Sequence, residues 1–165
     1  MIPSIESLSN TNGLKDLVAV GQSLIIWRNP LLIDIDGLSK LETVGGSLEI
    51  SENPILENLV GLKNLGSIAE SLTISKNANL VAFGGLTKLG HIGAGLHIEL
   101  NHSLPHINEI ENVKTVGAGV SIRYNDTLSS INGLKGLEAI TGDLTITGND
   151  NLPDCSIENV LKEIG

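Results

Sequence analysis

Apolar residues recur along this chain with a period of 24 residues, without insertion or deletion from Gly13 onward. When each unit is numbered from its first residue, mostly aliphatic side chains occupy positions 2, 5, 8, 12, 14, 20 and 23. A fixed period in this range indicates stacked repeat units rather than a conventional globular core. Residues that recur in every unit are expected to stabilise the fold, and residues that differ are free to recognise a partner. The six units begin at Gly13, Gly37, Gly61, Gly85, Glu109 and Gly133.

The local pattern favours strands over helices. Positions 11–16 alternate polar and apolar residues, as in Ser47–Ser51 and Asp143–Thr147, and this alternation is typical of a half-buried strand. The spacing of positions 2, 5 and 8 resembles a helix, but glycine at position 9 of several units leaves too few residues for a stable one. We therefore predict an all-β fold, a right-handed β-helix or solenoid of about six 24-residue coils. The handedness follows because parallel crossover connections are almost always right-handed.

Position 17 is asparagine in every unit. Backbone groups at a buried corner need hydrogen-bond partners, and an amide side chain both donates and accepts. Proline follows two of these asparagines and favours extended backbone before it, so left-handed geometry is not their shared role. We predict an inward-pointing asparagine ladder, in which the two apparent glycosylation sequons of the row are inaccessible. The row consists of Asn29, Asn53, Asn77, Asn101, Asn125 and Asn149.

One continuous repeat in 165 residues predicts a single solenoid domain over residues 1–165. We assign residues 1–12 to an N-terminal cap, 13–156 to six repeats and 157–165 to a C-terminal cap. The C-terminal cap is expected to be a short helix, because its apolar residues have helical spacing. The only cysteine, Cys155, falls in an inward column and is expected to be a buried thiol.

The composition narrows the choice of partners. A net charge of −9 argues against nucleic acid and anionic membrane surfaces, which need a basic face. No segment is long and apolar enough to insert into a membrane, and Met1–Asn12 lacks the pattern of a signal peptide. The sequence does not indicate an oligomeric state.

The four histidines all lie in the fourth unit, which raises the question of a metal site. They occupy positions 7, 13, 18 and 22, so they spread around the unit instead of converging as metal ligands must. No phosphate-binding loop, nucleophile motif or zinc motif appears. We therefore expect no enzyme activity, no cofactor and no metal. The histidines are His91, His97, His102 and His106.

The strongest binding signal lies at positions 13, 15 and 16, on the outward side of the predicted strand. The only tryptophan, the only tyrosine and both arginines of the chain fall there, and these residue types are enriched at interface hot spots. The alternative is that Trp27 covers the exposed edge of the first unit and that the other residues are ordinary surface. An ice-binding row of threonines is not formed, because only the last unit has a threonine pair. The candidate binding residues are Trp27, Arg28, Glu49, Glu52, Lys76, His97, Glu99, Arg123 and Tyr124.

The repeat G-L-x-x-L-x-x-I-G-x-x-L-x-I-x-x-N-x-x-L-x-x-I-x resembles that of receptor L domains, from Gly13 to about Cys155, and Gly37–Val60 is a close match. The resemblance implies a three-sided β-helix related to leucine-rich repeats, with a leucine-rich-repeat horseshoe as the nearest alternative. It also implies non-catalytic binding of protein or glycan at a cell surface or after secretion. A purely structural spacer or assembly element is the alternative function. The chain departs from the receptor domains in its single cysteine and perfect spacing.

Overall fold

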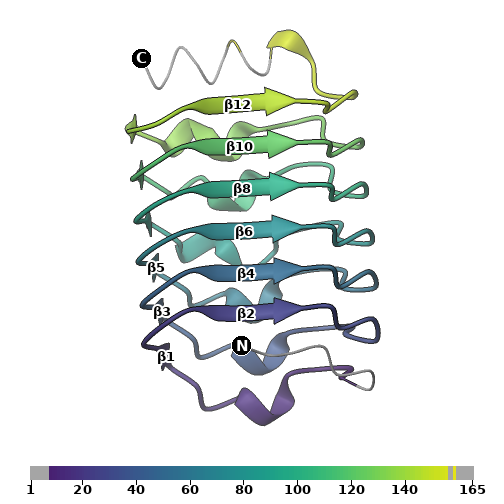
Figure 1. Cartoon of the computed structure of the whole chain (residues 1–165), viewed down its shortest axis with the longest axis vertical. Helices are drawn as coiled ribbons and strands as arrows, with labels where there is room; N and C mark the ends of the chain where they lie inside the picture. Colours follow the sequence, from purple (N-terminus) through teal and green to yellow (C-terminus); the bar gives the residue numbers. More distant parts are fainter. Residues whose placement is uncertain (1–7, 156–157, 159–165) are drawn as a thin grey trace.

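The computed structural model describes residues 8–155 and residue 158. Two parallel sheets, each of six strands, run the length of these residues in a solenoid-like all-β arrangement without long helices (Figure 1). This confirms the all-β prediction and the parallel pairing of successive units. Strands pair one unit apart, so that Leu24 stands beside Leu48 and Leu48 beside Leu72.

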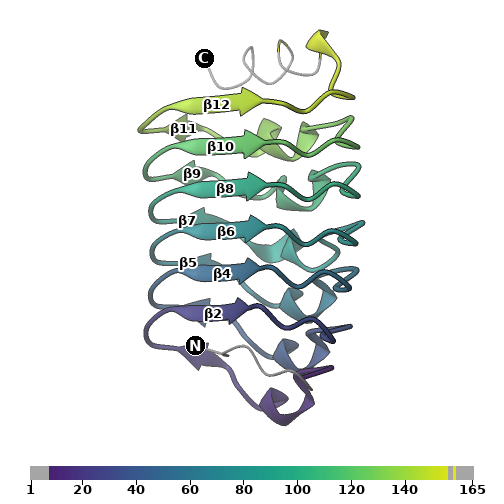
Figure 2. The same ribbon diagram turned by 45° about the vertical axis from the view of Figure 1, so that its right-hand side comes forward.

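The two sheets differ in strand length, as Figure 2 shows side by side. The long-strand sheet contains β2 (Leu24–Trp27), β4 (Leu48–Ser51), β6 (Leu72–Ser75), β8 (Leu96–Glu99), β10 (Val120–Arg123) and β12 (Leu144–Thr147). The short-strand sheet contains β1 (Ala19–Val20), β3 (Thr43–Val44), β5 (Ser67–Ile68), β7 (His91–Ile92), β9 (Thr115–Val116) and β11 (Ala139–Ile140).

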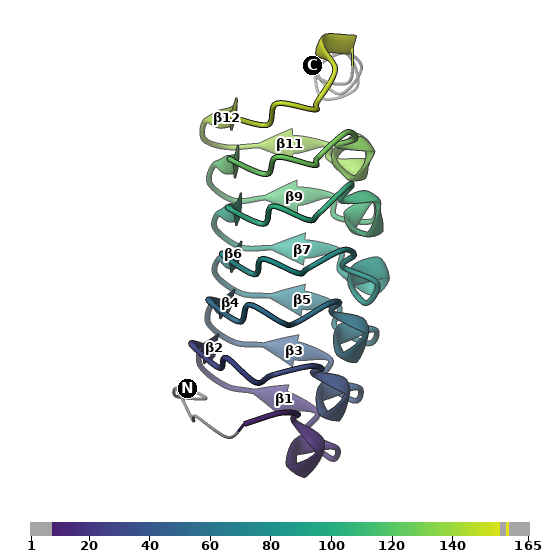
Figure 3. The same cartoon turned by 90° about the vertical axis from the view of Figure 1, so that its right-hand side faces the viewer.

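A third face, formed by positions 18–24 of each unit, joins the long-strand sheet to a row of short 3₁₀ helices (Figure 3). Two isolated parallel bridges, Asn58 to Ala82 and His106 to Ser130, lie in this face. Each 3₁₀ helix contains the apolar residue of position 2, and the apolar residue of position 8 lies in the short strand that follows. The 3₁₀ helices are η1 (Asn12–Leu14), η2 (Asp36–Leu38), η3 (Val60–Leu62), η4 (Leu86–Lys88), η5 (Asn108–Ile110) and η6 (Asn132–Gly136).

The core is a set of stacked aliphatic columns. Side chains such as Leu48, Ile50, Leu56 and Leu62 are fully buried, and the only phenylalanine, Phe83, lies among them. Some column members of the first and last units, such as Leu14 and Leu144, are only partly buried, because they have a described column neighbour on one side alone.

The asparagines of position 17 pair from unit to unit. The Oδ1 atom of Asn77 accepts the backbone N–H of Asn53 at 3.1 Å, and its Nδ2 atom donates to the carbonyl of Ile50 at 2.9 Å. Asn29, Asn53, Asn77, Asn101 and Asn125 are completely buried; the last member, Asn149, is partly buried. From Asn53 onward, each amide therefore satisfies backbone groups of the preceding unit at the corner where the long strand ends.

The residue before each asparagine has left-handed backbone. At position 16, φ lies between 55° and 58° for five non-glycine residues, and only the last unit has glycine there, Gly148 with φ 65°. A side chain in this conformation costs about 1–2 kcal/mol. The turn thus falls one residue earlier than the asparagines themselves, and position 16 carries side chains that do not favour it. The five residues are Arg28, Glu52, Lys76, Leu100 and Tyr124.

From the second unit onward, glycine at position 1 is required by close packing between units. A Cβ atom on Gly61 would overlap the carbonyl of Ile35, and one on Gly133 would overlap the carbonyl of Ile107. Glu109 is the exception, and the residue at the same spacing before it is Phe83, at the end of the third unit. There Gly84 has φ 63°, and the Phe83 carbonyl accepts the N–H of Gly85 at 2.6 Å.

The C-terminal end differs from the sequence expectation at Cys155. This thiol is exposed, so the prediction of a buried thiol is wrong. Asp154 and Cys155 are already helical, which takes the cysteine out of the repeating path and out of its inward column. Residue 158 of the expected capping helix is helical, and its other residues, like residues 1–7 of the expected N-terminal cap, lie outside the described residues.

The ladder makes a first prediction. Asn77→Ala leaves the buried Ile50 carbonyl and Asn53 N–H without their amide partner, so the free energy of unfolding should fall by about 3 kcal/mol. Urea denaturation measures this loss. Asn149→Ala, at the partly buried end of the ladder, is the matched control and should cost clearly less. Equal losses at the two positions would contradict a buried, paired ladder.

The left-handed row makes a second prediction. Leu100→Gly should leave stability unchanged or raise it by up to about 1 kcal/mol, because glycine adopts positive φ without strain. Leu100→Val should destabilise, because a β-branched side chain is strained there. At Thr73, an outward strand position, the order should reverse, with glycine worse than valine. The same order at both positions in thermal unfolding would argue against the left-handed backbone.

Candidate functional site

All nine candidate binding residues lie on the outer side or at the end of the long-strand sheet. Positions 13 and 15 alternate with the buried positions 12 and 14, and register aligns each with its equivalents in neighbouring units. Position 16 ends each strand, and its left-handed backbone directs the next residue inward as ladder asparagine. We refer to positions 13, 15 and 16 of this sheet as the sheet face.

Four of these residues form one connected group, the N-terminal cluster: Trp27, Arg28, Glu52 and Lys76. The Cζ atom of Arg28 lies 4.7 Å from the centroid of the Trp27 ring. The Nε atom of Arg28 donates to Glu52 at 2.7 Å, and the Nζ atom of Lys76 donates to the other carboxylate oxygen at 3.1 Å. The exposed fractions of the side chains are 60% for Arg28, 54% for Lys76 and 28% for Glu52. The carboxylate thus fixes two cations that remain accessible.

The two cations also change the acidity of Glu52. Hydrogen bonds from Arg28 and then Lys76 hold the pKa of this carboxyl below its ordinary value of 4.5. The Glu52 side chain is partly exposed and its two partners are mostly exposed, so the three charges order the surface and contribute little to stability.

A second group, the C-terminal cluster, consists of Glu99, Ser121, Arg123 and Tyr124. The hydroxyl of Ser121 donates to Glu99 at 2.7 Å, and Arg123 stands opposite Glu99 in the β10–β8 register. The Nε atom of Arg123 is buried and has no hydrogen-bond partner among the described residues. Tyr124 is 52% exposed, and its ring lies where a Cβ atom on Gly148 would be.

Glu49 on β4 and His97 on β8 lie on the sheet face but belong to neither cluster. Glu49 accepts the hydroxyl of Ser51, its neighbour two residues along β4. The ring of His97 lies against Gly95, where it would overlap an added Cβ atom. Among the described residues, no hydrogen bond or ion pair links either side chain to a cluster. The sequence-predicted site therefore falls into two clusters, with no side-chain hydrogen bond or ion pair between them among the described residues. They adjoin each other, because the backbone N–H of Lys76 donates to the carbonyl of Glu99 at 3.0 Å.

The other histidines make separate side-chain contacts. His91 contacts the hydroxyl of Thr115 at 2.8 Å, and His102 contacts Asp126 at 2.8 Å. His106 lies 3.6 Å from Glu109. Within the part of the chain that the structure describes, no group of three or more histidine, cysteine, aspartate or glutamate side chains is arranged to hold a metal ion. No helix in that part is long and apolar enough to cross a membrane.

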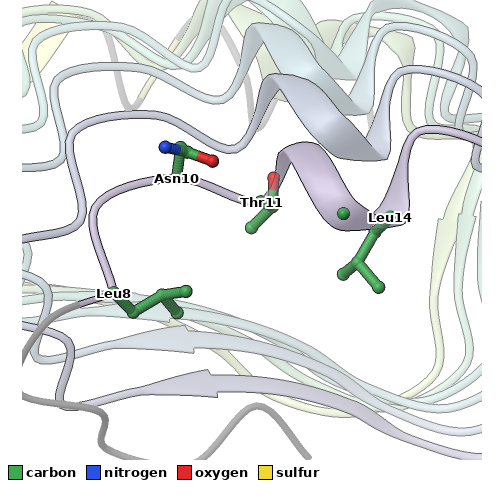
Figure 4. Close-up of a pocket in the computed structure, with 5 residues that line it drawn as sticks. Leu8, Asn10, Thr11 and Leu14 are labelled. Atoms are coloured by element: carbon green, nitrogen blue, oxygen red, sulfur yellow. The ribbon is translucent and has the colours of Figure 1, made fainter.

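Sequence reasoning missed a hollow of about 210 Å³ beside the first unit (Figure 4). It is lined mainly by apolar atoms, with Leu8 and Leu14 facing the same space. Thr11, which stands in the apolar position-23 column, is buried, and its hydroxyl oxygen has no partner among the described residues. In the sequence, the only indication of this hollow was a threonine, Thr11, in a column that is otherwise mostly apolar.

No family model, no curated protein and no solved structure matches this chain. The receptor L-domain resemblance therefore remains a resemblance of repeat pattern.

The N-terminal cluster generates a third prediction. NMR titration of the Glu52 carboxyl carbon should give a midpoint below 4.5, since both cations favour the charged form. Their stabilising contribution is present above the ordinary pKa and is lost as the pH falls through the lowered pKa. Arg28→Gln should raise the midpoint more than Lys76→Gln, because the Arg28 hydrogen bond is the larger cause.

The matched control is Lys40→Gln, which removes a cation that pairs with Asp16 away from the sheet face. It should leave the Glu52 midpoint unchanged. A midpoint at or above 4.5 in the unsubstituted protein would show that the three side chains do not pair in solution.

Proposed function

We propose that this chain is a non-catalytic binding module that recognises a protein partner through the sheet face. The observation that carries this proposal is the N-terminal cluster, in which an exposed Arg28 rests on Trp27 and is fixed by Glu52. Tryptophan and arginine dominate the binding energy of many protein interfaces. Here both are held in place before a partner arrives, which reduces the entropy lost on binding.

The charge of the sheet face also supports a protein partner. Three basic side chains balance three acidic ones on this face, whereas the whole chain carries a net charge of −9. A balanced mosaic repels neither sign and favours a partner with the complementary arrangement. The basic residues are Arg28, Lys76 and Arg123, and the acidic residues are Glu49, Glu52 and Glu99.

Protein is favoured over glycan because of the tryptophan. The Arg28 guanidinium lies over the Trp27 ring, where it occupies a ring face that a sugar would need for stacking. Arginine stacked on tryptophan is, by contrast, a frequent arrangement in protein interfaces.

The proposed scaffold is a single, right-handed, three-sided solenoid of six coils that is similar to receptor L domains. The unit-by-unit register of both sheets supports the stacking, and the general preference for right-handed parallel crossovers supports the hand. A location at the cell surface or outside the cell belongs to the same proposal and rests on the resemblance alone.

A structural spacer is the second candidate. The unbroken 24-residue period and the uniform asparagine ladder favour it, because a protein that serves only as a rigid rod requires regular repeats and no ligand-binding residues. In that case the clusters only solvate the rod and neutralise its surface.

The fourth prediction separates these functions. A partner captured from the native surroundings of the protein should lose affinity by about 2 kcal/mol on Trp27→Ala, and further when Arg123→Ala is added. Surface plasmon resonance measures both losses. The control is Thr43→Ala, an exposed change on β3 of the other sheet, and it should leave affinity unchanged.

Each other outcome is informative. A spacer yields no partner whatever the variant. A captured glycan in place of a protein would contradict the assigned class of partner. Unchanged affinity after both sheet-face substitutions would place binding elsewhere on the molecule.

A further inference from the structure

The third face carries a second interaction surface, separate from the sheet face. We propose that its first three units bind a segment of a partner protein that combines lysine or arginine with aliphatic side chains. The surface, which we name the acidic–apolar patch, lies on the face turned toward the viewer in Figure 3. It consists of Leu31, Ile33, Ile55, Val60 and Val81 with Asp34, Asp36 and Glu57.

The apolar members of the patch are unusually exposed. The exposed fractions are 50% for Leu31, 55% for Ile33, 42% for Val60 and 50% for Val81. Of the six large hydrophobic residues that are exposed among the described residues, these four share the third face. Exposed apolar side chains that gather on one face are characteristic of interaction sites.

The fold itself does not require these residues. Positions 19 and 21 flank the leucine of position 20, which is fully buried in the first five units, and both point outward. In the first three units they include Leu31, Ile33 and Val81, whereas in later units the same positions hold Ser103, Thr127 and Ser129. The later units keep their leucines, Leu104 and Leu128, fully buried beside these polar residues. The apolar character of the early units therefore serves something other than packing.

The acidic charge of the third face favours a partner with basic residues. Its segments, residues 30–36, 54–60, 78–84, 102–108, 126–132 and 150–154, contain aspartate and glutamate but no lysine or arginine. Among the ion pairs of the described residues, none involves Asp34, Asp36 or Glu57. Unneutralised carboxylates beside exposed aliphatic groups favour a cationic, apolar partner and disfavour an acidic one.

Two hollows in this region place a carboxylate next to a valine. One, of about 330 Å³, is lined by Glu57, Asn79, Val81 and Ser103. The other, of about 260 Å³, is lined by Asp36, Ser39, Val60, Gly61 and Lys63. A lysine or arginine side chain fits such a place, because its methylene stem packs on the valine while its charged end reaches the carboxylate. Lys63 also lines the second hollow and would repel a cation there, so the first hollow is the better site for a cation.

Other occupants fit less well. A second copy of this chain brings a net charge of −9 to an acidic surface, and an anionic membrane is repelled for the same reason. A cationic partner gains from both the charges and the exposed apolar area.

The fifth prediction tests the patch with a defined probe, a short synthetic peptide that alternates lysine with leucine. Isothermal titration calorimetry should detect binding that weakens with added salt, while a peptide that alternates glutamate with leucine should not bind. Leu31→Ser combined with Ile33→Ser should weaken binding of the lysine peptide about tenfold, as should Asp36→Asn combined with Glu57→Gln.

Matched controls separate the patch from general charge and apolarity. Val18→Ser removes an equally exposed aliphatic group outside the third face. Glu70→Gln combined with Asp143→Asn removes the same amount of charge from exposed residues elsewhere. Both controls should leave binding within about twofold. All variants change exposed residues, and thermal unfolding confirms that they fold.

Three results would overturn the proposal. One is that the lysine peptide does not bind the unsubstituted protein. Another is that the control charge variant weakens binding as much as Asp36→Asn with Glu57→Gln, which would mean that net charge alone attracts the peptide. The third is sedimentation that shows self-association lost with Leu31→Ser and Ile33→Ser, which would mean that the patch binds a second copy. Trp27→Ala should not change the affinity for the lysine peptide, so this experiment tests the acidic–apolar patch independently of the sheet face.

Discussion

Backbone groups at the corner after each long strand are buried, and they must be paired without water. Because the chain turns there once every 24 residues, each unit has the same buried backbone groups to pair. The asparagine of the next unit pairs them each time. Asn53 shows the full pattern, since its side-chain nitrogen donates to Ile26 and Ser51 while its own N–H donates to Asn77. The corner thus links each unit to the next through directional bonds, which fix the register that the aliphatic columns alone would leave free to slip.

The same corner determines where surface chemistry can differ. The left-handed residue at position 16 ends the strand and precedes the buried asparagine, so its side chain lies at the edge of the sheet face. Arg28, Glu52 and Lys76 follow one another there, and their alternating charges pair across units. Because the backbone of this position repeats almost exactly, side chains of different chemistry are presented with the same geometry. The residue at position 16 is therefore available to contact a partner, while the asparagine next to it at position 17 stabilises the fold.

Much of this architecture could be predicted from the sequence, because a repeat shows the same constraint six times. The inward columns, the parallel strands and the asparagine row all follow from the period. The left-handed row could not be predicted, since arginine, glutamate, lysine, leucine and tyrosine do not favour positive φ and only Gly148 pointed to it. Cys155 was misplaced because the repeat pattern continues in the sequence after the path of the backbone has changed to helix. The alternating charges of Arg28, Glu52 and Lys76 were visible, but the sequence does not specify which side chains of the sheet face bond to one another.

The invariant spacing also has a consequence for how distances on this molecule can change. Gain or loss of one whole unit would preserve the ladder, the register of both sheets and the packing of glycine against the preceding carbonyl. Gain of a unit between Lys76 and Glu99 would move the N-terminal and C-terminal clusters apart by one strand spacing, about 4.8 Å. The separation of the two clusters can therefore change only in steps of one strand spacing. Related proteins with more units would hold the two clusters farther apart by whole strand spacings, while the geometry within each cluster stays the same.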